Sequence, residues 1–309
     1  MTGATQLLTI AENSYNELGQ LKTKKVGNAV QQMDYQYNIR GWLTQINDPE
    51  VAPTAAKKLS LRLRYTDPIA SLAAQVQYNG NISAIEWRTS ESTGGSPNTK
   101  QGYGFEYDAL NRLSTSVYGD GASLTSNKNR FNESITGYDL NGNITGLVRR
   151  NNNQEVDRLA YSYDTGGNQL TRVADNAPTA TRAQIFLDGN TAGNDYSYDL
   201  NGNMTQDKNK GITQVSYNYL NLPQKIVGGS QTIEYIYSAN GQKLQKKVPN
   251  NEITCYSGNF IYEGTSLKQV LHGEGYIDMN GTPTYHYYLK DHLGNNRMVV
   301  NQSGTVVQQ

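Results

Sequence analysis

The chain has 309 residues, of which 36% are hydrophobic, with a mean hydropathy of −0.69 and a formal net charge of zero. The balanced charge argues against a nucleic-acid partner, because no basic stripe is present to meet phosphates. No run of about 18 apolar residues occurs, so the sequence predicts no membrane span, and the single cysteine, Cys255, excludes an internal disulfide framework. The low hydropathy would fit disorder, but 23 tyrosines in strict alternation do not.

A tyrosine followed by an Asp- or Asn-rich turn recurs along the chain. Copies begin at Tyr15, Tyr37, Tyr78, Tyr107, Tyr138, Tyr163, Tyr198, Tyr219 and Tyr237, and residues 59–65 are expected to hold one more. Asn-Gly and Gly-Asn supply the positive φ of a tight turn. Upstream pairs such as Tyr196 and Tyr198 place both rings on one face of a strand. Each copy therefore predicts a β-hairpin whose tyrosines pack against neighbouring hairpins.

Two copies, 138–144 and 198–204, are nearly identical. Their predicted turn residues are Asp139, Asn141 and Gly142 in the first and Asp199, Asn201 and Gly202 in the second. The Asp-x-Asn-x-Asn spacing resembles the opening of a calcium loop, which needs a bidentate Glu at its twelfth position. That position holds Arg150 in one copy and Lys210 in the other. Turn formation is therefore the favoured interpretation, and no metal site is predicted here.

Insertions rich in Gly, Asn, Pro, Thr and Ala interrupt the array at 48–58, 119–132 and 175–194. Such composition is typical of surface loops. A short helical turn is expected, if anywhere, at 53–58. The two lysine-rich runs, 22–25 and 243–247, are predicted to lie at solvated sheet edges, where lysine discourages strand association.

Groups that commonly carry chemistry lack a recognisable arrangement. The histidines are His272, His286 and His292, and no pair of them has familiar zinc spacing. No serine lies in a nucleophile elbow, and no glycine-rich stretch continues into a phosphate-binding Lys-Ser/Thr. His292 follows Asp291, but neighbours on a strand point to opposite faces, so Asp291 and Gly294 are predicted turn formers. The sequence thus predicts no catalytic residue, cofactor or metal.

The Tyr-Asp copies resemble the YD repeats of the Rhs family, and residues 257–297 resemble the start of the Rhs repeat-associated core. The distinctive part is Tyr-x-x-Asp-His-Leu-Gly-Asn-x-Arg, formed here by Tyr288, Asp291, His292, Leu293, Gly294, Asn295 and Arg297. The resemblance covers nearly the whole chain except the insertions. It implies a YD-repeat array over 1–250 and the truncated beginning of the core domain over 251–309.

The Rhs resemblance implies an all-β fold, in which a long antiparallel strip of hairpins spirals into a partial hollow shell. It also implies a structural role, which is to enclose or present a C-terminal toxin or effector of a longer chain. Polymorphic toxins and teneurin-like surface proteins are built in this way, so a secreted or cell-surface location is expected. The partners implied are that toxin and further YD repeats.

The chain departs from the Rhs pattern where relatives cut themselves with an aspartyl protease. The Asp-Pro pairs of this sequence are Asp48-Pro49 and Asp67-Pro68, far upstream of the signature, so no catalytic residue is carried over. The alternative is a binding module whose exposed tyrosines hold a glycan or a partner surface. Several exposed rings gathered in one groove would favour that alternative.

Overall fold

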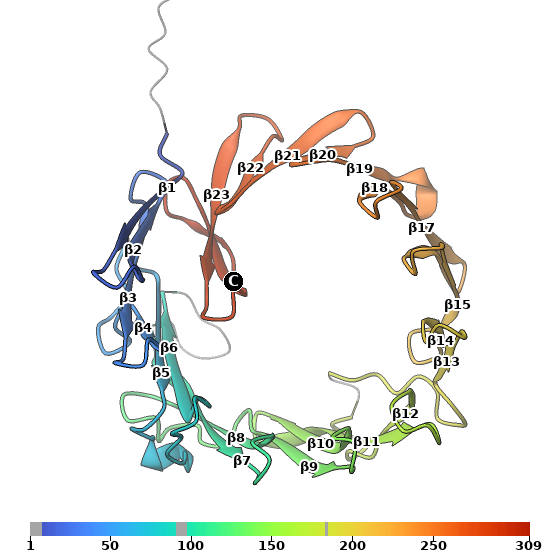
Figure 1. Ribbon diagram of the computed structural model, residues 1–309, viewed down its shortest axis with the longest axis horizontal. Helices are drawn as coiled ribbons and strands as arrows, with labels where there is room; N and C mark the ends of the chain where they lie inside the picture. The colour runs from blue at the N-terminus through green and yellow to red at the C-terminus, as the bar shows by residue number, and fades with distance from the viewer. Residues whose placement is uncertain (1–7, 91–97, 183–184) are drawn as a thin grey trace, which may run out of the picture. The chain divides into compact units, whose positions relative to one another are not determined.

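The computed structural model describes residues 8–90, 98–182 and 185–309, and its regular secondary structure is almost wholly β-strand (Figure 1). The strands form two antiparallel sheets in strict chain order, β1 to β12 and β13 to β25. The prediction of an all-β strip of hairpins is confirmed. The helical segments among the described residues are two 3-10 turns, η1 (Ala70–Leu72) and η2 (Pro249–Asn251).

The prediction of a helical turn at 53–58 is wrong. Thr54 and Lys57 instead form an isolated β-bridge there, with hydrogen bonds in both directions between their main chains. No helix in the described parts of the chain has both the length and the apolar character needed to cross a membrane.

Two compact units make up the chain. The first comprises Met1–Asn129 with Gln269–Gln309, and the second comprises Arg130–Lys268. The predicted boundary at residue 250 separates two sequence families, the YD-repeat array and the Rhs-type core. This boundary stays a prediction. The first unit contains β1 (Ala11–Tyr15), β2 (Leu21–Val26), β3 (Gln31–Tyr37), β4 (Leu43–Ile46), β5 (Leu59–Arg64), β6 (Ala84–Thr89), β7 (Gln101–Tyr107) and β8 (Leu113–Asp120), and then most of β21 (Ser266–His272), β22 (Gly275–Asp278), β23 (Thr284–Lys290), β24 (Asn296–Asn301) and β25 (Val306–Gln308).

The second unit contains the longer run of tyrosine hairpins. Its strands are β9 (Glu133–Tyr138), β10 (Ile144–Asn151), β11 (Gln154–Tyr163), β12 (Leu170–Asp175), β13 (Tyr196–Tyr198), β14 (Met204–Asp207), β15 (Ile212–Tyr217), β16 (Pro223–Gly228), β17 (Gln231–Tyr237), β18 (Lys243–Lys247), β19 (Ile253–Ser257) and β20 (Phe260–Glu263). Strands of three to ten residues alternate with short turns, as the repeated turn residues predict, except for the insertion between β12 and β13.

The apolar core of the first unit is completed by two of its non-repeat segments. Leu72 of η1 and Leu124 of the 119–132 insertion are buried against glycines of β7 and β8. A side chain at Gly104 would lie 2.4 Å from the carbonyl oxygen of Leu72, and one at Gly119 would lie 2.3 Å from that of Leu124. The sheet thus carries glycine where these segments cross it, and the insertion is more than a surface loop.

The C-terminal strands of the first unit pack on its N-terminal strands. Lys24 Nζ lies 2.6 Å from Glu274 Oε1, and both side chains are mostly buried. Tyr287 is fully buried beside Gly27, where a Cβ would lie 2.5 Å from Cε2 of the ring. Burial, together with the nearby Glu274 carboxylate, raises the pKa of Tyr35 to about 12. Residues about 250 positions apart therefore share one interface.

Both lysine-rich runs lie in interior strands, which corrects their predicted place at sheet edges. The run 22–25 lies in β2, which pairs with β1 and with β3, and the run 243–247 forms β18, which pairs with β17 and with β19. The charged heads have local partners: Lys25 meets Glu12 at 3.4 Å, and Lys243 Nζ lies 4.7 Å from the ring centroid of Tyr235. Long aliphatic stems let such residues cover a half-buried sheet face.

Candidate functional site along the turns of the repeats

The two clearest turns are closed by an aspartate. Asp139 Oδ1 accepts hydrogen bonds from the backbone N–H groups of Asn141 and Asn143 at 2.9 and 2.8 Å, and its Oδ2 accepts from Asn143 Nδ2 at 2.8 Å. Asp199 does the same with Asn201 and Asn203, at 2.9, 2.8 and 3.0 Å. These carboxylates are occupied by their own turns, which leaves no open ligand set for calcium.

The hydrogen bond from the Asn143 side chain is the main cause that lowers the pKa of Asp139, and Asn203 acts in the same way on Asp199. A carboxylate whose pKa is lowered by folding stabilises the protein at pH values above its unfolded pKa. That contribution is lost as the pH falls through the folded pKa. The turns should therefore loosen only in acid, below about pH 4.

Gly142 and Gly202 occupy the left-handed region, with φ of +87° and +82°. Valine at either position should lower the free energy of unfolding by about 1–3 kcal/mol, because a β-branched residue is strained there. Gly273→Val is the matched control, since Gly273 has no positive φ and no atom within 4 Å of its Cβ position. Equal losses in all three variants, measured by urea unfolding, would contradict the assignment. From the sequence, valine at Gly94 is expected to destabilise less than at these two turns, and Gly94 lies outside the described residues.

The Asp291 turn has the same construction. Asp291 Oδ1 accepts from the backbone N–H groups of Leu293 and Asn295 at 2.9 and 3.0 Å, and Gly294 has φ of +84°. The other signature residues lie around this turn. Burial lowers the pKa of His292, and Leu293 is exposed. The Arg297 guanidinium lies 6.0 Å from the Trp87 ring centroid. The ring centroids of Tyr288 and Tyr276 are 6.0 Å apart. The arrangement gives Asp291 a structural task, which is to close the turn.

Seven tyrosines of the array are joined to the preceding hairpin through their hydroxyl groups. Tyr163 Oη donates to the carbonyl oxygen of Ile144 at 2.8 Å, and Tyr198 Oη donates to that of Leu170 at 2.7 Å. Tyr37, Tyr65, Tyr107, Tyr217 and Tyr237 donate in the same way to Leu21, Leu43, Ile82, Met204 and Pro223. Except for Ile82, each acceptor is the first residue of the strand that follows the preceding turn. The tyrosines thus form a ladder between hairpins.

Tyr65 makes this bond, so residues 59–65 do hold the additional copy expected between Tyr37 and Tyr78. The choice of Tyr219 as a repeat tyrosine is wrong. Tyr217 donates to Met204, while Tyr219 lies in the turn with 80% of its surface exposed. Both tyrosines neighbour an asparagine in the sequence, and only the burial of the ring distinguishes them.

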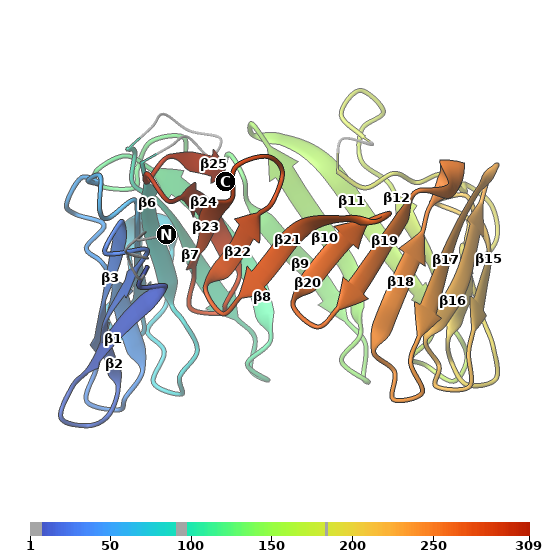
Figure 2. The same ribbon diagram turned by 90° about the horizontal axis from the view of Figure 1, so that it is seen from above.

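Side-chain amides connect neighbouring turns. The Nδ2 groups of Asn201 and Asn203 both donate to Asn221 Oδ1 at 3.0 Å, and those of Asn141 and Asn143 both donate to the carbonyl oxygen of Gly167. Figure 2 shows that the β15–β16 and β17–β18 turns lie at the same end of their strands. The turns of the second unit therefore lie side by side along one edge of the strip.

That edge carries exposed aliphatic side chains. Leu140 and Leu200, each one residue after the turn aspartate, have relative exposures of 106% and 107%. Within the first unit, Ile39 lies at the equivalent turn position and reaches 105%. The short turns at the opposite edge of the second unit are polar: Asn152-Asn153, Gly229-Ser230 and Gly264-Thr265. Turn geometry requires Asp, Asn and Gly but no leucine. A leucine recurring in the turn was the signal in the sequence for this apolar edge.

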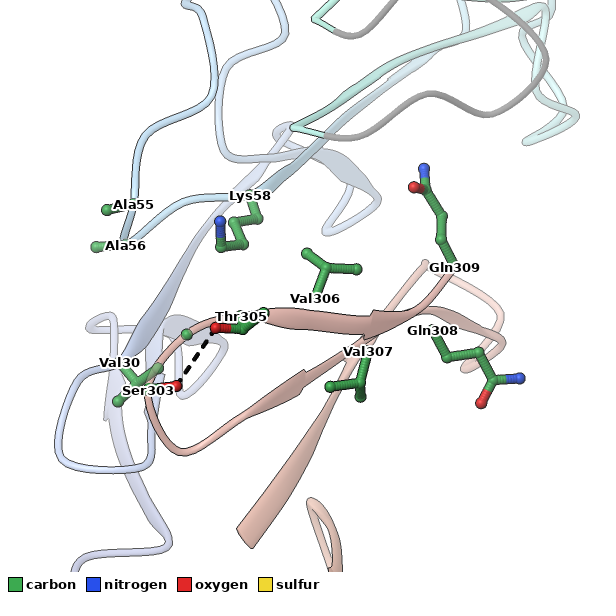
Figure 3. A pocket seen from close by; sticks show the side chains of 11 residues that line it. Val30, Ala55, Ala56, Lys58, Ser303, Thr305, Val306, Val307, Gln308 and Gln309 are labelled. Atoms are coloured by element: carbon green, nitrogen blue, oxygen red, sulfur yellow. Dashed lines mark hydrogen bonds between the residues drawn. The ribbon is translucent and has the colours of Figure 1, made fainter. Parts of the chain in front are cut away.

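Several grooves lie in the first unit, and two of them involve its C-terminal strands. The larger has a volume of about 890 Å³ and lies between β25 and the segment around Lys58 (Figure 3). Its lining is Val30, Ala55, Ala56, Lys58 and residues 303–309. Figure 3 shows Val306 directed toward Lys58 and Val307 directed away from it. No Asp, Glu, His or Cys side chain lines this groove, so its side chains offer apolar contacts and hydrogen bonds.

The smaller groove has a volume of about 290 Å³ and combines two aromatic rings with polar groups. It is lined by Gln269, Tyr276, Tyr288, Asn296, Arg297, Met298, Val299, Gln308 and Gln309. Tyr276 also stacks on His286, with ring centroids 4.6 Å apart and planes 3° from parallel. Among the residues that the structure describes, no three or more His, Cys, Asp or Glu side chains are grouped as metal ligands.

No family model and no curated protein sequence matches the chain. Among solved structures, TcdB2-TccC3 matches with a TM-score of 0.66 and 16% identity, over 99% of this chain and 16% of the solved chain. A TcdB2-TccC3-Cdc42 structure matches equally. TcdB2-TccC3 without its hypervariable C-terminal region matches with a TM-score of 0.63 and 16% identity, over 96% of this chain and 15% of that one. The present chain spans about one-sixth of the length of these proteins, and it shares the fold of that part of TcdB2-TccC3.

Proposed function

We propose that the chain is a structural segment of a YD-repeat shell, which encloses or presents a C-terminal toxin or effector of a longer protein. The fold shared with TcdB2-TccC3 over 96–99% of the chain carries this proposal. One of those structures lacks a hypervariable C-terminal region, so that protein has a variable segment beyond its constant part. The partners proposed here are such a segment and further YD repeats, and the proposed location is secreted or cell-surface.

The hydrogen bonding within and between the repeats supports a structural role as the wall of such a shell. Turn carboxylates accept hydrogen bonds from their own turns, and tyrosine hydroxyls donate to the hairpin before. Polar groups that satisfy one another in this way contribute rigidity and leave few free groups for catalysis. The exposed side chains of Leu140 and Leu200 supply apolar surface along one edge of the second unit. Further YD repeats that packed against this edge would bury that surface.

Limited proteolysis of the full-length gene product tests this function. In a shell, residues beyond 309 should resist protease while the native protein is intact, and they should be cleaved once the wall is unfolded by urea. Gly273→Ala provides the matched control, because it should keep the wall intact. Immediate cleavage of those residues in the native protein, with the wall still folded, would contradict encapsulation.

The smaller groove favours a second candidate function, the binding of a glycan. Tyr276 and Tyr288 both line it beside the Arg297 guanidinium and several amides, which is the combination that stacks on and hydrogen-bonds to sugars. Glycan-array screening of the chain and of Tyr288→Ala tests this candidate, with Tyr235→Ala as a control outside the groove. Binding by all three proteins, or by none, would reject the groove as a glycan site.

The purified chain should neither cleave itself nor hydrolyse a substrate. Asp291 is engaged in its turn, and the residues after 300 hold no carboxylate or histidine to act as a base. We expect one band of full mass by mass spectrometry after several days at neutral pH. A discrete product that disappears in both Asp291→Ala and His292→Ala would show that this region is catalytic.

A further inference from the structure

The insertion between β12 and β13 rests on buried carboxylates rather than lying free on the surface. Asp157 Oδ1 accepts from the Phe186 backbone N–H at 3.1 Å. Asp195 accepts from the Val173 backbone N–H at 2.7 Å and from Asn190 Nδ2 at 2.8 Å. Both aspartates are fully buried. The described parts of the insertion, 176–182 and 185–195, are therefore anchored on the second unit.

Two further carboxylates belong to this region, Asp175 at the end of β12 and Asp188 within the insertion. Asp175, which is 2% exposed, uses Oδ1 to accept from the backbone N–H groups of Arg158 and Ala177, both at 2.9 Å. Asp188 Oδ2 accepts from the backbone N–H of Asp175 at 3.0 Å, which places the Asp188 carboxylate against the main chain of Asp175. The remaining oxygens, Asp175 Oδ2 and Asp188 Oδ1, are buried and have no hydrogen-bond partner among the described residues.

No basic side chain among the described residues neutralises this pair. Two other buried aspartates of the unit do have one, since Asp157 meets Arg149 at 2.7 Å and Asp207 meets Lys210 at 3.7 Å, whereas Asp195 accepts from neutral N–H groups. Within the described residues, neither Asp175 nor Asp188 has a cationic nitrogen within 4.0 Å of its carboxylate. Arg182 NH1 donates to the main-chain oxygen of Asp175 at 3.1 Å, not to its carboxylate. Unpaired buried carboxylates are costly.

We propose that Asp175 Oδ2 and Asp188 Oδ1 bind one divalent cation that fixes the insertion on the end of β12. Two carboxylates cancel the charge of such an ion, and an all-oxygen site favours Ca²⁺ over zinc. Water and main-chain oxygens would complete the coordination, because no third carboxylate is grouped with them in the described chain. So few protein ligands predict weak binding, on the order of 10⁻⁴–10⁻³ M.

Thermal unfolding with millimolar CaCl₂ or with EDTA tests the site. Asp188→Asn keeps an oxygen that can accept from the Asp175 N–H while removing the charge. Asp139→Asn is the matched control, because it makes the same charge change at a turn whose oxygens are occupied. Calcium should raise the melting temperature of the wild type and of Asp139→Asn by several degrees. It should leave the melting temperature of Asp188→Asn unchanged.

Terbium luminescence gives a readout that does not depend on the variants. The wild-type chain should bind one terbium ion, whose luminescence is sensitised by tyrosine and which calcium displaces. The site is rejected if calcium leaves the melting temperature of the wild type unchanged, or if it raises the melting temperatures of the wild type and of Asp188→Asn equally. Greater stability of Asp188→Asn than of the calcium-saturated wild type would also reject it, as would terbium binding with any other stoichiometry.

Discussion

Gly275→Ala should lower the free energy of unfolding of the first unit by about 3 kcal/mol or more. Gly275 pairs with Tyr287 across β22 and β23. A methyl group there would lie 2.0 Å from the carbonyl oxygen of His286 and 2.9 Å from its carbonyl carbon. These atoms belong to the main chain, so no rotamer change relieves the clash. The strands must separate, and the contact between Glu274 and Lys24 should weaken with them.

Gly273→Ala, two residues earlier, is the matched control, because its added methyl group meets no atom within 4 Å. Urea unfolding followed by tryptophan fluorescence compares the two variants. Hydrogen exchange should show faster opening of β23 in Gly275→Ala alone. Equal stability of the two variants would mean that β22 and β23 do not pair in this register.

Tyr198→Ala should cost about 3 kcal/mol, because it removes a half-buried ring and the hydroxyl that bonds to Leu170. Tyr198→Phe should cost about 1 kcal/mol, since it keeps the ring and loses only the hydrogen bond. The difference in the free energy of unfolding between the two variants gives the contribution of the ring packing. The loss in Tyr198→Phe gives that of the hydrogen bond to Leu170.

Tyr219→Ala is the matched control in the same repeat pattern, and it should change stability by less than about 0.5 kcal/mol because its ring is exposed. Chemical unfolding of all three variants and the wild type gives the comparison. A loss for Tyr219→Ala as large as that for Tyr198→Ala would return Tyr219 to the role of repeat tyrosine. A Tyr198→Ala variant of wild-type stability that no longer bound a glycan would favour a binding module instead.

Local chemistry explains why much of the fold was predictable. Asp139, Asn141 and Gly142 act within one turn, so their type and spacing are enough to place that turn and the strands on either side. The antiparallel order follows because short turns join each strand to its neighbour. Paired tyrosines then indicate which strand face is buried.

Features that depend on distant residues were not predictable. Tyr217 and Tyr219 have similar neighbours, and only the position of Met204 in the preceding hairpin selects Tyr217. The large groove joins residues around 56 to those around 306, and no local pattern connects them. Asp175 and Asp188 look like ordinary loop residues until the insertion folds back over β12.

The direction of the tyrosine bonds has a consequence for synthesis. Each hydroxyl reaches back to an acceptor that lies 13 to 28 residues earlier in the chain. During translation the acceptor strand therefore leaves the ribosome before the donor tyrosine does. Each new hairpin can bond to the preceding hairpin as soon as its own tyrosine emerges. Such short loops close quickly. A ribosome that stalls midway leaves the hairpins already made complete, whereas deleting one hairpin from the middle leaves the next tyrosine without its acceptor.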